Sequence, residues 1–120
     1  DSLMHDLALE AMAITAQILA TTLKLPLAQE ETGASPIVLD IRKRGVADHV
    51  IGSLPHSWDT TSDSIAAAIA TTTESALLLV KSTPPPTHDL ERLASKGWVD
   101  HSFPTACIDL EDICWAAPRQ

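Results

Sequence analysis

The stretch Ala76-Leu77-Leu78-Leu79-Val80 is the clearest structural signal in the chain, and the loop Lys81-Ser82-Thr83-Pro84-Pro85-Pro86-Thr87 follows it directly. A short, fully apolar run is typical of a buried parallel strand, so we expect residues 76–80 to lie in the centre of a sheet. A helix is predicted over residues 87–96, with Thr87 as its N-cap and Gly97 as its C-terminal stop.

Shorter patterns on either side of this stretch predict further elements. Residues 37–41 read as a buried strand, residues 53–57 as a short edge strand around Pro55, and residues 64–72 as a helix. We expect a last strand over residues 103–108 and a final helical segment over residues 109–115. This alternation predicts an α/β fold with a mostly parallel central sheet and helices on both faces.

The N-terminal segment predicts a long helix over residues 3–24, ended by Pro26. Its apolar residues recur at three- and four-residue steps and leave only a narrow polar stripe. We therefore expect most of its circumference to be covered, either by a sheet or by a partner. Glu10, Gln17 and Lys24 interrupt it, which favours a packed helix over a membrane span. The start, Asp1-Ser2-Leu3-Met4, lacks the basic region of a signal peptide, and without an initiating Met we expect a fragment or a processed chain.

Composition narrows the function classes. A chain of 120 residues with no shift in composition is expected to form one domain, residues 1–120. Its net charge of −8 and its 3% aromatic content argue against a nucleic-acid partner. Two cysteines without a CxxC pair suit a reducing compartment, so we expect a cytoplasmic protein.

Two segments of the chain resemble the rhodanese-like family. The first is Ile37-Val38-Leu39-Asp40-Ile41-Arg42 followed by His49-Val50-Ile51-Gly52-Ser53-Leu54, similar to a strand ending in Asp-Val-Arg and then a His-Ile-Pro-Gly-Ala-Ile pattern. The second is the strand, loop and helix of residues 77–98, which ends in Gly97-Trp98. The resemblance covers residues 36–118 and implies a rhodanese-like three-layer domain. It leaves residues 1–27, the apolar helix, unexplained.

The sequence departs from this family at the place of the catalytic cysteine, which falls on Lys81 or Ser82. Sulfur transfer needs a thiolate and a cradle of backbone N–H groups, and the three prolines of the loop have no N–H. The resemblance therefore implies the fold without the reaction: a non-catalytic protein-interaction or regulatory module with no catalytic residue, cofactor or metal. Its candidate binding loop, at the pseudo-active site, comprises Lys81, Ser82, Thr83, Thr87 and His88.

Other interpretations remain open at this stage. A sulfurtransferase with a relocated thiol would use Cys107, with Cys114 as the second possible thiol, and it requires Cys107 to be exposed with a depressed pKa. An unrelated flavodoxin-like or receiver-like domain would present Asp40 at a strand end, although we read Asp40 and Arg42 as structural. The expected partner is another protein or domain, or a second copy bound through the N-terminal helix, with no membrane involved.

Overall fold

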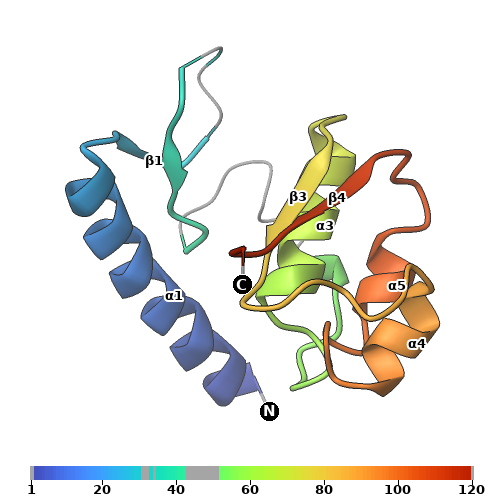
Figure 1. The fold of residues 1–120 in the computed structure, drawn as a ribbon. Helices are drawn as coiled ribbons and strands as arrows, with labels where there is room; N and C mark the ends of the chain where they lie inside the picture. The colour runs from blue at the N-terminus through green and yellow to red at the C-terminus, as the bar shows by residue number, and fades with distance from the viewer. Residues whose placement is uncertain (1, 31–32, 34, 43–51, 120) are drawn as a thin grey trace. The chain divides into compact units, whose positions relative to one another are not determined.

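The computed structural model describes residues 2–30, 33, 35–42 and 52–119, which form two compact units, residues 1–49 and 50–120. It confirms a mixed α/β chain (Figure 1). Within the described residues each unit contains one two-stranded parallel sheet. The single three-layer domain and its rhodanese-like sheet stay predictions.

The first unit consists of α1 (Ser2–Leu23), β1 (Leu27–Ala28) and β2 (Val38–Leu39), with β1 and β2 paired in parallel. The helix predicted over residues 3–24 is confirmed. It ends three residues before Pro26, because Lys24 adopts a left-handed φ of 54° and the Leu25 N–H donates to the Ala20 carbonyl at 2.9 Å. The strand predicted over residues 37–41 is present in shortened form, whereas β1 had no sequence signal.

Helix α1 does not have the covered circumference that its composition predicts. Its buried positions are His5, Ala13 and Ala20, whereas Leu3, Leu7, Ile14 and Ile18 are each more than half exposed. By length and composition alone, residues Leu3–Leu23 would suffice to cross a membrane. Leu9 and Met12 are partly buried, so only part of the apolar surface of this helix is covered.

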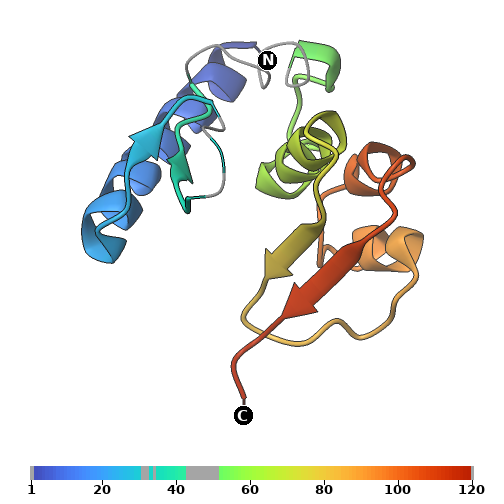
Figure 2. The ribbon, with the colours of Figure 1, turned by 90° about the horizontal axis from the view of Figure 1, so that it is seen from above.

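The second unit contains α3 (Ser62–Thr72), β3 (Leu77–Val80), α4 (Leu90–Ser95), α5 (Phe103–Ala106) and β4 (Ile113–Ala116). Strands β3 and β4 pair in parallel, with Leu77 opposite Ile113 and Val80 opposite Ala116. The connection between them carries α4 and α5, as a parallel pair requires (Figure 2).

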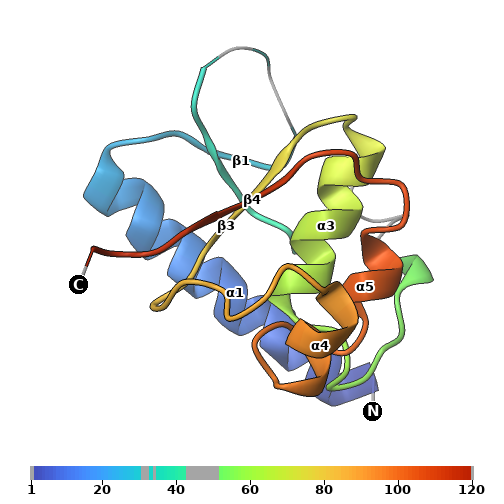
Figure 3. The same ribbon diagram turned by 45° about the vertical axis from the view of Figure 1, so that its right-hand side comes forward.

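The core of this unit lies on one face of the β3–β4 sheet. Leu77 and Leu79 point into it and meet Leu93 of α4 and Phe103 of α5. The opposite face of β3 is open, because Leu78 is 57% exposed and Val80 is 73% exposed. The strand itself is confirmed, but among the described residues it pairs with β4 alone, so the prediction that it lies in the centre of a sheet is wrong. Figure 3 shows α3 beside this sheet.

Two predictions near the C-terminus are wrong: a helix stands where we expected a strand, and a strand stands where we expected a helix. Residues 103–108 form no strand: the chain turns into helix α5, with Pro104 in its first turn, where proline fits. The helix predicted over residues 109–115 is instead strand β4. Its side chains alternate, with Ile113 and Trp115 partly buried and Cys114 exposed, which is the period of a strand.

Two smaller predictions also need correction. Residues 53–57 form no strand: the Ser57 N–H donates to the Pro55 carbonyl at 2.9 Å, and the segment turns toward α3. The N-cap of α4 is Asp89, which accepts from the Arg92 N–H at 3.1 Å, while Thr87 accepts from the Asp89 N–H at 3.2 Å. The predicted stop at Gly97 is confirmed, with a left-handed φ of 67°.

The N-terminus of α3 is capped from a distance by Asp100. Its carboxylate accepts from the Thr61 N–H at 2.8 Å, the Thr61 Oγ1 hydroxyl at 2.9 Å and the Ser64 N–H at 3.0 Å, and it also bonds the Ser64 hydroxyl. The N-cap residue Thr61 makes no side-chain cap of its own. Asp100 therefore satisfies donors that a helix start leaves without partners.

Candidate functional site

The candidate binding loop begins where β3 ends. Lys81 continues the ladder, because its N–H donates to the Ala116 carbonyl at 2.9 Å. Beyond it the chain runs through the three prolines to Thr87 and His88. Ser82, Thr83 and His88 are exposed, and Thr87 is partly buried. The structure therefore gathers the predicted loop residues at the carboxyl end of β3, where ligands of parallel sheets usually bind.

Lys81 is the charged residue of this loop, and its ammonium group forms an ion pair with Asp63. Its Nζ lies 2.7 and 2.9 Å from the two carboxylate oxygens of Asp63, in the first turn of α3. The same Nζ sits 5.3 Å from the centroid of the Trp98 ring. An ammonium group held in this way is a tether between the strand end and α3, so the loop presents hydroxyl and imidazole groups rather than a free cation.

An aromatic cluster supports the base of the loop. Trp98 and Trp115 meet edge to face with centroids 5.1 Å apart, and Phe103 lies 6.1 Å from Trp115. These three residues come from the segment after α4, from α5 and from β4. Trp98 is the member that contacts Lys81, and the sequence contained no signal that the three rings would meet.

Cys107 does not meet the requirements of a relocated nucleophile. It is 4% exposed and belongs to the hydrophobic core of the second unit. Burial, with a smaller contribution from the negative charge of Asp100, raises the pKa of Cys107 to about 12. The thiolate needed for sulfur transfer is therefore disfavoured, and the structure does not provide the exposed Cys107 with a depressed pKa that this alternative requires. Cys114 is a free thiol on the exposed side of β4.

Asp40 and Arg42 form an anchor in the first unit. Asp40 is 5% exposed and accepts from Nε and Nη2 of Arg42 at 3.2 and 2.8 Å. Nη1 of Arg42 donates to Glu10 of α1 at 3.1 Å. Hydrogen bonds with Asp40, and then with Glu10, raise the pKa of Arg42 above its usual range. Within the described residues the pair links the end of β2 to α1, which agrees with a structural role. Residues 43–51, which include Lys43, Arg44 and the His49 motif, lie outside the described residues.

Comparisons of the chain with protein-family models, with curated proteins and with solved structures find no match. The rhodanese-like interpretation therefore depends on the quoted segments of this sequence alone.

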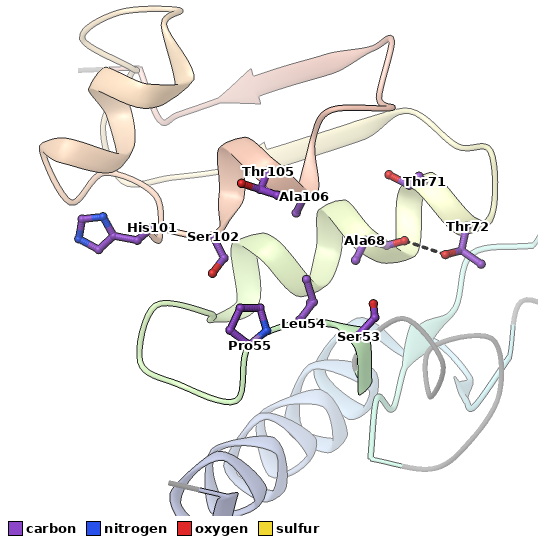
Figure 4. A pocket seen from close by; sticks show the side chains of 10 residues that line it. All are labelled: Ser53, Leu54, Pro55, Ala68, Thr71, Thr72, His101, Ser102, Thr105 and Ala106. Atoms are coloured by element: carbon purple, nitrogen blue, oxygen red, sulfur yellow. Dashed lines mark hydrogen bonds between the residues drawn. The ribbon is translucent and has the colours of Figure 1, made fainter.

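A hollow of about 500 Å³ lies elsewhere in the second unit, between α3, α5 and the segment before α3 (Figure 4). The sequence did not point to it. Small residues and hydroxyls line it: Ser53, Leu54, Pro55, Ala68, Thr71, Thr72, His101, Ser102, Thr105 and Ala106. The hydroxyls of Thr71 and Thr72 donate to carbonyls of their own helix at 3.0 and 2.9 Å. Among these lining residues His101 is the one ionisable side chain, so the hollow holds no acid–base pair.

Metal chemistry has no support in the part of the chain that the structure describes. Within residues 2–30, 33, 35–42 and 52–119, no three side chains of His, Cys, Asp or Glu gather in a way that could hold an ion. The loop after β3 is mostly exposed, and its first residue is held by Asp63 and Trp98.

Proposed function

We propose that this chain is a non-catalytic rhodanese-like module that acts by binding another protein or domain. One observation carries the proposal: where the family places its catalytic cysteine, at the carboxyl end of the strand Leu77–Val80, this chain has Lys81 bound to Asp63 and Trp98. A side chain tied in this way supplies neither a nucleophile nor a persulfide carrier.

The loop that follows supports the same conclusion. Pro84, Pro85 and Pro86 donate no backbone hydrogen bonds, so they cannot contribute to a cradle around a developing anion. Rigid proline segments with exposed neighbours such as Ser82 and Thr83 lose little conformational entropy on binding. These properties favour recognition over catalysis.

The receiver-like alternative has less support. A phosphorylatable aspartate needs an accessible carboxylate, whereas Asp40 is buried against the guanidinium of Arg42. Parallel pairing of the strands is shared by the rhodanese-like and receiver-like classes, so it does not discriminate between them. Binding at the β3 loop is the function that we retain.

Intact mass spectrometry after incubation with thiosulfate, followed by removal of small molecules, tests the absence of sulfur transfer. We expect no reducible gain of one sulfur atom in the folded protein, with a catalytically active rhodanese as the positive control. The Lys81→Cys variant should also fail to turn over thiosulfate, because a thiol alone does not restore the missing N–H donors. A stoichiometric persulfide on the native chain, at either Cys107 or Cys114, would overturn the proposal.

A further inference from the structure

The loop between β3 and α4 contains a proline segment, residues 83–86, whose backbone conformation follows from its covalent chemistry. Pro84, Pro85 and Pro86 each have a ring that fixes φ near about −65°. A residue that precedes a proline is also kept out of the helical region, and Thr83, Pro84 and Pro85 each precede one. The two restrictions together favour polyproline II, a left-handed helix with three residues per turn.

The carbonyls of this segment are free to accept hydrogen bonds. The prolines have no N–H, and no described residue donates a hydrogen bond to a backbone carbonyl of residues 82–86. Polyproline II likewise has no internal hydrogen bonds and leaves its carbonyls open. A partner with suitably placed donors can therefore bind the backbone of the proline segment directly.

Two of the three sides of the segment face solvent. Thr83 and Pro86 are three residues apart, so they lie on the same side of a helix with three residues per turn, and both are exposed. With a rise of about 3.1 Å per residue, they form a ridge about 9 Å long. Pro84, on a second side, is exposed as well, whereas Pro85 is partly buried. The segment thus presents proline rings to the outside.

Both ends of the proline segment are held by neighbouring elements. Before it, the Lys81 N–H donates to the Ala116 carbonyl at 2.9 Å, and Lys81 Nζ lies 2.7 and 2.9 Å from the Asp63 carboxylate oxygens. After it, the Thr87 hydroxyl accepts from the Asp89 N–H at 3.2 Å, and Asp89 caps α4. A segment that is ordered before it meets a partner loses less conformational entropy on binding.

We infer that the proline segment is a polyproline II ligand, and that its partner is a protein domain with an aromatic-lined groove. Domains that recognise polyproline II pack proline rings against aromatic side chains. The hydroxyl of Tyr and the indole N–H of Trp in such a groove would donate to the open carbonyls. This inference rests on the proposed interaction function and deepens it by naming the class of partner.

A second copy of this chain does not fit that class of partner. The chain has three Trp, one Phe and no Tyr. Trp98 and Trp115 pack against one another with centroids 5.1 Å apart, and Phe103 lies 6.1 Å from Trp115. The remaining ring, Trp58, is 74% exposed, and a single ring does not line a groove. The partner is therefore a different protein.

NMR titration of the isotope-labelled native protein with a purified WW domain, and separately with a purified SH3 domain, tests the inference. Both kinds of domain bind polyproline II through aromatic grooves. We expect saturable binding of at least one of them, with the largest shifts at the amides of the residues that flank the prolines: Ser82, Thr83, Thr87 and His88.

Single proline variants localise the contact. Pro86→Ala should weaken binding about tenfold, because it removes a ring from the exposed ridge and relaxes the backbone. Pro118→Ala is the matched control, since Pro118 is an exposed proline of the same unit outside the loop, and it should bind like the native chain. Far-UV circular dichroism verifies that both variants are folded. A decaproline peptide should displace the native chain from the domain, because both occupy the groove.

Three results would overturn the inference: no binding to either domain, equal binding by Pro86→Ala and Pro118→Ala, or shifts centred away from the loop. None of them bears on the thiosulfate experiment. A persulfide on the native chain would instead remove the non-catalytic function, so the two failures are distinguishable.

Discussion

Replacing Asp100 by alanine removes the cap of α3 and should strongly destabilise the second unit. The carboxylate bonds two backbone N–H groups and two hydroxyls, from Thr61 and Ser64. Loss of a helix cap costs about 1 kcal/mol. The Ser64 hydroxyl has no exposed surface, and a buried hydroxyl left without its partner costs about 1–3 kcal/mol. Thr61 is exposed, so water replaces its bonds at little cost.

These contributions predict a loss of about 3 kcal/mol in the free energy of unfolding. For a domain of about 60–100 residues this lowers the melting temperature by about 12–24 °C. Differential scanning calorimetry and urea unfolding both measure it. The conservative Asp100→Asn variant keeps one acceptor oxygen and the shape of the side chain, so it should lose about half as much.

Asp109→Ala is the matched control, because Asp109 is an exposed acid of the same unit and its loss should change stability by less than about 0.5 kcal/mol. A loss below about 1 kcal/mol for Asp100→Ala would refute the reasoning. It would mean that the donors of α3 find water or other partners as readily as the carboxylate.

Two further predictions concern the thiols and the anchor in the first unit. Iodoacetamide at pH 8 should modify Cys114 but not Cys107 in the folded protein, giving one adduct by mass spectrometry, because burial raises the pKa of Cys107 to about 12 from its ordinary 9.0. The same shift stabilises the folded state fully below about pH 9, and this contribution is lost as the pH rises toward 12, so a Cys107→Ala comparison should show a shallower alkaline decline. Two adducts at pH 8 would contradict the burial of this thiol. Arg42→Gln should lower the urea midpoint more than Glu10→Gln, because it deprives the buried Asp40 carboxylate of its guanidinium, whereas Glu10 is mostly exposed. Equal losses would mean that the Asp40 contact contributes nothing.

The candidate site was only partly predictable. The strand before it and the absence of a thiol in the loop follow from the local sequence alone. The partner of Lys81 does not, because Asp63 is 18 residues away and belongs to another element. The capping role of Asp100 has no local signal for the same reason, since this residue caps a helix that begins 38 positions earlier in the chain.

The segment from Phe103 to Ala116 shows most clearly where local pattern fails. Both of its apolar runs are short, and a short apolar run fits a strand or a helix equally well by periodicity. Contact with β3 decided between the two. The run Ile113–Ala116 forms the strand that pairs with β3, and the earlier run packs Phe103 and Cys107 into the core.

The sequence by itself determined the elements whose signals are long or purely local: α1 with its repeating apolar residues, β3 with its apolar run, and the turn at Gly97. These depend on backbone propensity and on periodicity, which neighbouring residues set. The tertiary structure alone decided which apolar surfaces are covered. In the tertiary structure Cys107 is buried, Lys81 forms an ion pair with Asp63, and large side chains of α1 such as Ile14 and Ile18 stay exposed. Burial and ion pairing arise from contacts between segments that are distant in the chain, so the local sequence does not set them.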